Sequence, residues 1–284
     1  MLSMQVFVGI VYCVCGIVLV PFYLRILYIF CTQKRYRSLE CYQIMIQIGV
    51  AQCLMAPGTF LVGLTNLMDG DPYRLAAASL KVLSTAIRVE AILSFVLALN
   101  RLKIICRLSY SKQVHSALVA LAWLFGVMYL AFFFSPWCDY IVVPGRYISW
   151  YDYNKPYSYL LKRVGSFVLI TSTLMTLCVY VIILAYLLIT KMKVGKRIDL
   201  QKERGILLYV GIRFIFDMFL TVTYNFVHLP STPWIDFINY MMYVVNNLVL
   251  PPVLYLCLYG HLRNCFWGVR KYQVSTSPLF PNIG

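Results

Sequence analysis

One apolar stretch of the sequence, Leu75–Asn100, carries four polar side chains at helical spacing. Ser84, Thr85 and Arg88 stand three, four and seven residues after Lys81, so a helix places all four on one face. Two cations beside two hydroxyl groups would bind an anion or another hydrogen-bond acceptor. The alternative is structural: the lysine extends toward the polar headgroups of a membrane, and the arginine pairs with another helix. The four residues are Lys81, Ser84, Thr85 and Arg88.

Three further ionisable residues lie inside apolar stretches, where each charge needs a partner. Glu90 is two residues from Arg88 and so faces a different neighbour, which favours a structural role. Arg213 and Asp217 are four residues apart and can pair on one helical face. This pair would act either as a lock between helices or as a purely structural contact, and the spacing fits both.

The sequence offers little for catalysis or metal binding. His115, His228 and His261 lie in separate parts of the chain, and no His pair, His-Glu motif or Ser-His-Asp arrangement is credible with only these three histidines. The ten cysteines lack metal-ligand spacing, and only Cys138 is expected on the outer side, so we expect no disulfide between outer loops. We therefore expect no enzyme activity, no metal and no cofactor.

The composition indicates a membrane protein. Hydrophobic residues make up 61% of the 284 residues and charged residues 12%, against about 45–50% and about 25% in soluble domains. The net charge of +15 is divided among short stretches between apolar runs; this is typical of loops at an anionic leaflet and not of a nucleic-acid binder. Seven runs long enough to span a bilayer predict an all-α membrane protein, a seven-transmembrane helix bundle. The runs are approximately Met4–Cys31, Cys41–Asn66, Leu75–Asn100, Ser116–Trp137, Leu161–Thr190, Gly205–Leu229 and Trp234–Tyr259.

The basic residues predict how the bundle is oriented. The first, third and fifth connections and the carboxyl tail carry 16 Lys and Arg, and the opposite side carries at most five. Because positive residues favour the cytosolic side, the tail is expected in the cytosol and the amino terminus outside. The outer segment Cys138–Tyr159 is rich in Tyr and Trp. It is either an interfacial aromatic belt or a lid whose Trp150 and Tyr151 contact a ligand.

Prolines inside the runs favour kinks, because proline removes a backbone donor. A kinked bundle can have two packings of similar energy, as a signalling switch requires. Transporters have such kinks as well, so the feature does not separate the two classes. The prolines are Pro21, Pro57, Pro251 and Pro252.

Three segments of the chain resemble rhodopsin-like receptors. Leu97–Leu102 stands where that family has its acidic-Arg-Tyr motif, and Arg101 matches the arginine that contacts the G protein. Pro251–Tyr255 resembles Asn-Pro-x-x-Tyr, with Pro251 in place of Asn. Gly260–Phe266 resembles the short amphipathic helix on the inner leaflet, where Cys265 is either palmitoylated or unmodified. With the Arg213–Asp217 pair, the resemblance gives as switch candidates Asn100, Arg101, Arg213, Asp217, Pro252 and Tyr255.

The similarity is closer to the nematode serpentine chemoreceptors, class T in particular. Leu19–Leu24, Cys41–Met45 and Leu97–Arg101 are similar to segments of that class, in helix order. The resemblance implies an orphan chemosensory G-protein-coupled receptor of the plasma membrane, including that of sensory cilia. Its partners would be a small-molecule ligand in an outward cavity, a heterotrimeric G protein and the lipid bilayer. Residues 1–260 would form the receptor domain, and residues 261–284 a short cytosolic amphipathic helix and a disordered tail.

The sequence departs from the family pattern in four places. Gln52 stands where many members have Asp, which removes a ligand for bound sodium. The third helix begins without Cys, no acid precedes Arg101, and the sixth helix lacks Trp-x-Pro. The outer disulfide and two inner switches of the family are therefore missing.

The resemblance implies signalling by a population shift, in which the ligand binds more tightly to the active arrangement. Outward movement of the sixth helix would then open a cleft beside Arg101. The alternative is a small transporter or ligand-gated channel subunit, whose intramembrane charges mark an ion path. Against it, the sequence has no internal repeat and no paired broken helices.

Overall fold

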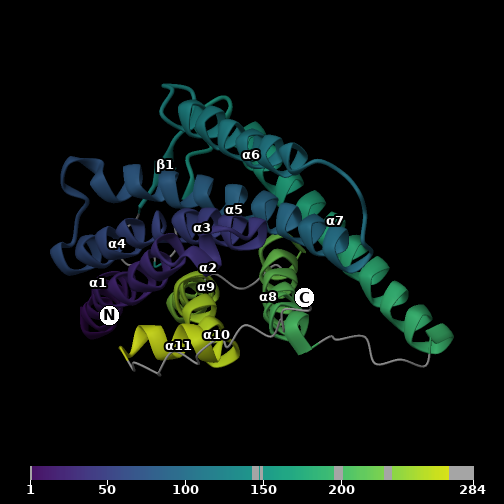
Figure 1. Ribbon diagram of the computed structural model, residues 1–284. Helices are drawn as coiled ribbons and strands as arrows, with labels where there is room; N and C mark the ends of the chain where they lie inside the picture. The colour runs from purple at the N-terminus through teal and green to yellow at the C-terminus, as the bar shows by residue number, and fades with distance from the viewer. Residues whose placement is uncertain (1, 143–146, 148–149, 195–200, 227–231, 269–284) are drawn as a thin grey trace, which may run out of the picture.

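The structure is a computed structural model that describes residues 2–142, 147, 150–194, 201–226 and 232–268. Long helices lie side by side in a bundle, with a small hairpin at one end (Figure 1). In chain order the elements are α1 (Leu2–Thr32), α2 (Lys34–Arg37), α3 (Glu40–Cys53), α4 (Ala56–Met68), η1 (Pro72–Arg74), α5 (Leu75–Ile105), α6 (Lys112–Phe133), β1 (Tyr140–Ile141), β2 (Trp150–Tyr151), α7 (Ser158–Val194), α8 (Gln201–Phe226), α9 (Pro233–Val244), η2 (Val245–Val249), α10 (Leu250–Leu258) and α11 (Gly260–Phe266).

The helices confirm the predicted fold class. Among the described residues, six helical segments are long and apolar enough to cross a membrane. The remaining predicted run, the sixth, corresponds to α8, which at 26 residues is about 39 Å long and packs against α7 and α10. The fourth predicted run differs from its helix, α6, at both ends. The fourth helix starts earlier, because the Ser111 hydroxyl caps it by accepting from the Gln113 N–H at 3.2 Å, and it ends before Trp137.

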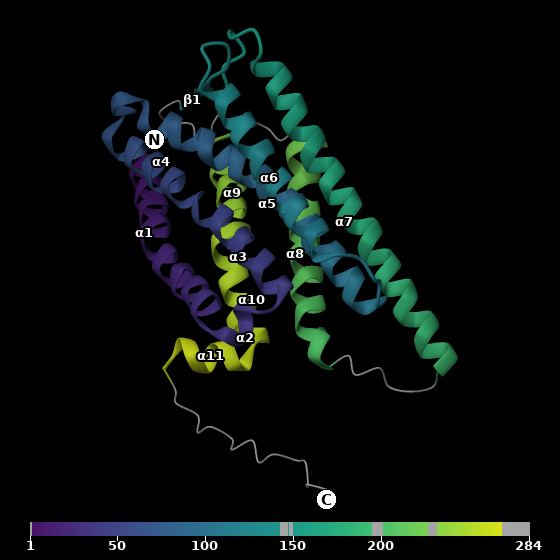
Figure 2. The same ribbon diagram turned by 45° about the horizontal axis from the view of Figure 1, so that its top comes forward.

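The two ends of the bundle carry different elements. The start of α1 and the hairpin lie at one end, while α2 and α11 lie at the other (Figure 2). We call the first the outer end and the second the inner end, following the predicted orientation. Residues 269–284, which include most of the predicted disordered tail, lie outside the described residues.

Proline interrupts the helices in two different ways. The second predicted span is divided into α3 and α4 at two residues that precede Pro57, which stands in the first turn of α4. The seventh span passes from α9 through the π-helix η2 into α10, just before Pro251 and Pro252. Pro21, by contrast, lies within a continuous α1. Both cavities described below lie beside η2.

The outer end is closed by a two-stranded antiparallel hairpin, in which Tyr140 pairs with Tyr151 and Ile141 with Trp150. Its tyrosines pack with Tyr129 and Phe133 of α6, with ring centroids as close as 4.6 Å between Tyr140 and Tyr151. The sequence had predicted only a loop here. Sequence patterns for hairpins need longer alternating runs, and these strands have two residues each.

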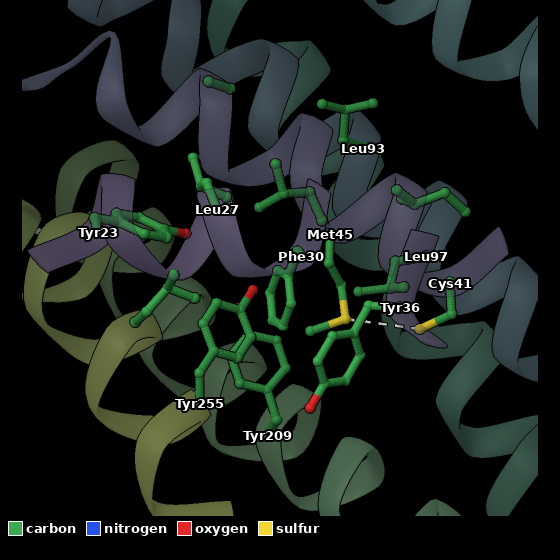
Figure 3. Close-up of a cluster of buried hydrophobic side chains, with 14 of the residues drawn as sticks. Tyr23, Leu27, Phe30, Tyr36, Cys41, Met45, Leu93, Leu97, Tyr209 and Tyr255 are labelled. Carbon is green, nitrogen blue, oxygen red and sulfur yellow. Dashed lines mark hydrogen bonds between the residues drawn. The ribbon is translucent and has the colours of Figure 1, made fainter. Parts of the chain in front are cut away.

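Aromatic packing fills the inner half of the bundle (Figure 3). The Phe30 ring of α1 lies 5.5 Å from that of Tyr255, and the Tyr255 ring stacks on Tyr209 of α8 at 4.8 Å. The Cys41 thiol contacts the Met45 sulfur at 3.6 Å. Burying rings from α1, α8 and α10 together sets the spacing of these helices, since each buries about 150–250 Å².

Candidate functional site

A cavity of about 80 Å³ lies in the outer half of the bundle, between α4, α5, β1, α7, α9 and η2. Most of its wall is apolar, including Leu80, Ile87 and Leu248. Polar groups enter it at a few points only, from Thr59, Ser84, Arg88, Tyr140, Tyr240, Tyr243 and Asn247. An apolar wall with a few convergent polar groups is the usual character of a small-molecule site.

Arg88 is the cation in this wall, and its side chain is held from several sides. Its Nη1 donates to the Ser84 hydroxyl at 2.7 Å and to the Ser84 carbonyl, and its Nη2 donates to the Tyr151 hydroxyl at 3.1 Å. The guanidinium also lies over the Tyr129 ring, 5.1 Å from its centroid. The residue is 3% exposed. Its position is therefore set before any ligand binds.

Gly165 of α7 makes room for this arginine. A Cβ at this position would collide with the Arg88 Nε and the Tyr129 hydroxyl.

Tyr151 of the hairpin feels the charge of Arg88. Burial by itself would raise the pKa of Tyr151, but the charge of Arg88 and hydrogen bonds from neighbouring hydroxyls lower it below its usual value. The hairpin therefore both covers the cavity and orients its cation.

Lys81 takes part in a different contact, at the edge of the hairpin. Its ammonium lies 3.0 Å from one carboxylate oxygen of Asp139, and Arg74 binds the other oxygen at 2.6 Å. Burial would raise the pKa of Asp139, but hydrogen bonds from Arg74 and Lys81 outweigh it and hold the pKa below its usual value. The structure thus uses Lys81 to fasten the segment before β1 to α5.

Of the five ligand candidates predicted from sequence, the structure brings Arg88 and Tyr151 together. Thr85 does not line the cavity, and its hydroxyl donates to the Lys81 carbonyl of its own helix at 2.9 Å. Trp150 pairs with Ile141 through the hairpin backbone, and its side chain lies outside the described part of the chain. Sequence reasoning missed Tyr240 and Asn247, which are polar groups in otherwise apolar stretches.

A buried ionic cluster lies immediately inward of the cavity, around Arg213 of α8. Its Nη2 lies 2.8 Å from a Glu90 carboxylate oxygen, and its Nε lies 3.3 Å from Asp217. The predicted contact between Arg213 and Asp217 is confirmed, and Glu90 is a second acidic partner. The Arg213 guanidinium also donates to the Asn247 side-chain oxygen at 2.9 Å and to the Asn246 carbonyl. A second cavity of about 60 Å³ borders the cluster.

Pro251 explains why the Asn246 carbonyl is open to Arg213. In η2 the Leu250 N–H donates to the Val245 carbonyl, one residue further back than in an α-helix. The next N–H along would serve Asn246, but Pro251 has none. The freed carbonyl therefore accepts from the guanidinium. The π-helix also turns both Asn246 and Asn247 inward, where each is less than 5% exposed.

Gln52 joins this cluster to α1 and α3. Its buried amide is satisfied when its oxygen accepts from Arg213 Nη1 at 3.1 Å and its nitrogen faces the Tyr23 hydroxyl. An amide orientation is assigned from such contacts. The Arg213 guanidinium thus lies beside Gln52, which stands where many members of the family that the sequence resembles have an aspartate.

The inner switch candidates lie below the ionic cluster. Arg101 is 2% exposed and lies in the inner part of α5. Asn100 is fully buried, and within the described residues its side-chain amide has no hydrogen-bond partner. The Tyr255 hydroxyl, by contrast, contacts the Tyr209 hydroxyl at 3.0 Å. The last switch candidate, Pro252, is buried in the first turn of α10.

Cys265 lies on α11, whose Leu262 and Phe266 are buried. The Phe266 ring stacks on Phe22 of α1 at 6.3 Å. The Cys265 sulfur is half-buried and lies 3.7 Å from His261 Nδ1. All ten cysteines are free thiols in the structure, so no disulfide holds the described part of the hairpin.

The bundle belongs to the rhodopsin class of folds. The chain superposes on squid rhodopsin with a TM-score of 0.68, over 95% of this chain and 86% of that one, at 12% sequence identity. At this identity the likeness shows the fold alone. No protein-family model matches the sequence, and the comparison with curated proteins gives no match.

Proposed function

We propose that the protein is a G-protein-coupled receptor that binds a small molecule in the outer cavity. The supporting observation is the position of Asn247. It forms part of the wall of the outer cavity, and it also accepts a hydrogen bond from Arg213 at 2.9 Å. A ligand that displaces this asparagine changes how α8 is held to η2. Binding is thereby linked to the helix whose movement would open the inner end.

The cavity limits the ligand. Its volume of about 80 Å³ is roughly half of the 150 Å³ apolar cavity that admits benzene. The ligand is therefore compact and largely apolar, with one hydrogen-bond acceptor directed at Arg88. Small volatile carbonyl compounds and short-chain carboxylates have this chemistry, which agrees with a chemosensory role.

The signal passes inward through the Arg213 cluster. Asp217 lies on α8 beside Arg213, whereas Glu90 belongs to α5 and Asn247 to η2, so loss of the Asn247 contact leaves α8 held to α5 and lets it take a new position. Asn100, Arg101 and Tyr255 then form the inner surface that a heterotrimeric G protein contacts. Palmitoylation of Cys265 would anchor α11 to the inner leaflet. The receptor acts in the plasma membrane, including that of sensory cilia.

A ligand screen in nanodiscs tests the proposal. The purified chain is combined with a panel of heterotrimeric G proteins, and nucleotide exchange is measured with short carboxylates, ketones and aldehydes. We expect at least one compound to raise the exchange rate in the wild type and to fail in Arg88→Gln. The matched control is Arg163→Gln, an arginine of α7 that stacks on Tyr159 outside the cavity.

Flux measurements in proteoliposomes separate this function from a transporter or channel. We expect no ligand-dependent ion or solute flux. Flux in the absence of any nucleotide exchange would overturn the receptor proposal.

A further inference from the structure

Four polar side chains from α3, α5, α6 and the segment between α5 and α6 meet at the inner end, apart from the ionic cluster described above. Glu40 begins α3, Lys103 lies in the last turn of α5, Tyr110 follows α5, and His115 lies in the first turn of α6. The His115 Nδ1 is 2.8 Å from one Glu40 oxygen, and the Lys103 ammonium is 3.5 Å from the other. The Tyr110 hydroxyl is 3.1 Å from His115 Nε2. His115 is 2% exposed.

Counting hydrogens gives the charge state of the imidazole. The Tyr110 hydroxyl has one hydrogen and donates it to the Leu99 carbonyl at 3.2 Å. It can then only accept from His115, so Nε2 carries a hydrogen. Nδ1 lies 2.8 Å from one Glu40 carboxylate oxygen, and Lys103 contacts the other, so Nδ1 carries one as well. When Tyr110 makes both of its contacts, the arrangement therefore requires a doubly protonated histidine beside Glu40.

The neutral histidine requires a different arrangement. With one ring hydrogen directed at Glu40, Nε2 becomes an acceptor, and the Tyr110 hydrogen must turn toward it. The Leu99 carbonyl then loses its contact with Tyr110. Burial and the charge of Glu40 raise the pKa of Tyr110, so this hydroxyl keeps its hydrogen and cannot replace the lost proton. One proton thus decides whether Tyr110 contacts both α5 and α6 or α6 alone.

We propose that His115, Glu40 and Tyr110 form a proton-binding site that fastens residues 106–111 to α5. The groups that face the imidazole are Glu40 from α3 and Tyr110 from the connecting segment, with Lys103 of α5 on the far oxygen of Glu40. The protonated form makes the contacts, so the segment is fastened at low pH and released as pH rises. Histidine side chains ordinarily change charge between about pH 5 and 8, and this sets the pH range of the test.

The site lies next to the signalling candidates. Leu99, whose carbonyl accepts from Tyr110, is two residues from Arg101 on the same helix. Release of Tyr110 therefore frees the inner end of α5 beside Arg101. This inference does not depend on the proposed ligand or on G-protein coupling.

Two measurements on the full chain in nanodiscs test the site. The ¹⁵N shifts of labelled histidines report how many ring nitrogens carry hydrogen, and His115→Gln assigns the resonance among the three histidines. We expect both His115 nitrogens to be protonated at about pH 6. Glu40→Gln should release the second hydrogen at lower pH.

Hydrogen exchange over residues 106–111 provides the second measurement, corrected for the intrinsic pH dependence of exchange. We expect protection to fall as pH rises in the wild type, by up to about tenfold for the lost hydrogen bond between Tyr110 and the Leu99 carbonyl. Tyr110→Phe and His115→Gln should remove the pH dependence. His261→Gln, at the same end and next to Tyr36, should leave it unchanged. A singly protonated His115 at low pH, or equal protection of the segment at both ends of the range, would overturn the proposal.

Discussion

Asn247 accepts a hydrogen bond from Arg213 at 2.9 Å, and the same asparagine forms part of the wall of the outer cavity. The outer cavity and the ionic cluster are thus joined by one side chain, without an intervening layer. Coupling between two sites requires an element that both of them bias. Here that element is η2, and Pro251 and Pro252 after it lack the backbone N–H groups that would otherwise pair with its carbonyls.

Removing the charge of Arg213 should destabilise the bundle strongly. Arg213→Met leaves Glu90 buried beside Asp217 without their cation, and breaking a buried pair in this way costs about 3–5 kcal/mol. Thermal unfolding in nanodiscs measures the effect. The double variant Arg213→Met, Glu90→Gln should recover part of the loss, because it removes one uncompensated acid. Strictly additive effects of the two substitutions would contradict their coupling.

Two glycine substitutions should have opposite effects. Gly165→Ala places a Cβ against Arg88 and Tyr129, so it should destabilise by about 1–3 kcal/mol through overpacking and weaken ligand binding. Gly211→Ala meets no atom within 4 Å and should be neutral, or stabilising by up to about 1 kcal/mol, because alanine favours the helix. Unfolding temperatures and ligand affinity measured on both variants check the contrast. Equal stability of the two variants would show that the space beside Arg88 is not needed.

The contact of Asp139 with Lys81 and Arg74 predicts an acid-sensitive outer end. The folded-state pKa of Asp139 is lowered, so its stabilisation is present above its unfolded pKa of about 3.9 and is lost as pH falls through the folded value. Hydrogen exchange of the hairpin at decreasing pH measures this loss. Asp139→Asn should show weaker protection already at neutral pH and no further loss in acid.

Within that contact, Lys81 should matter more than Arg74. The side chain of Lys81 is 12% exposed and that of Arg74 is 67% exposed, and solvent weakens exposed ion pairs. Lys81→Gln should therefore reduce hairpin protection more than Arg74→Gln does, as measured by the same exchange experiment. A larger effect of Arg74→Gln would show that the shorter distance outweighs burial.

Arg101→Ala should abolish ligand-driven nucleotide exchange while leaving ligand binding in the outer cavity intact. Ligand binding should be unaffected because Arg101 lies at the inner end and does not line the outer cavity. Exchange assays and binding measured on the same preparation check this. An unchanged exchange rate in the variant would refute the role proposed for Arg101.

Seven apolar runs, and the contact between Arg213 and Asp217, could be predicted from the sequence because both depend on local periodicity. A helix brings residues four apart together whatever the rest of the chain does. The same rule placed Lys81, Thr85 and Arg88 on one face of α5, and their spacing is as expected. It could not show which of them line a cavity.

The partners of those residues were decided only by the tertiary structure. Glu90 meets Arg213 across 123 positions of sequence, and Lys81 meets Asp139 only because the hairpin folds back over the outer end. The Asn246 carbonyl is free to accept from Arg213 because of a π-helical turn. Such a turn arises when the backbone hydrogen bonds shift by one residue, and no pattern of side chains in the sequence indicates it. Buried charges must find partners, so the sequence required such contacts. The packing of separate helices determined which of these contacts formed.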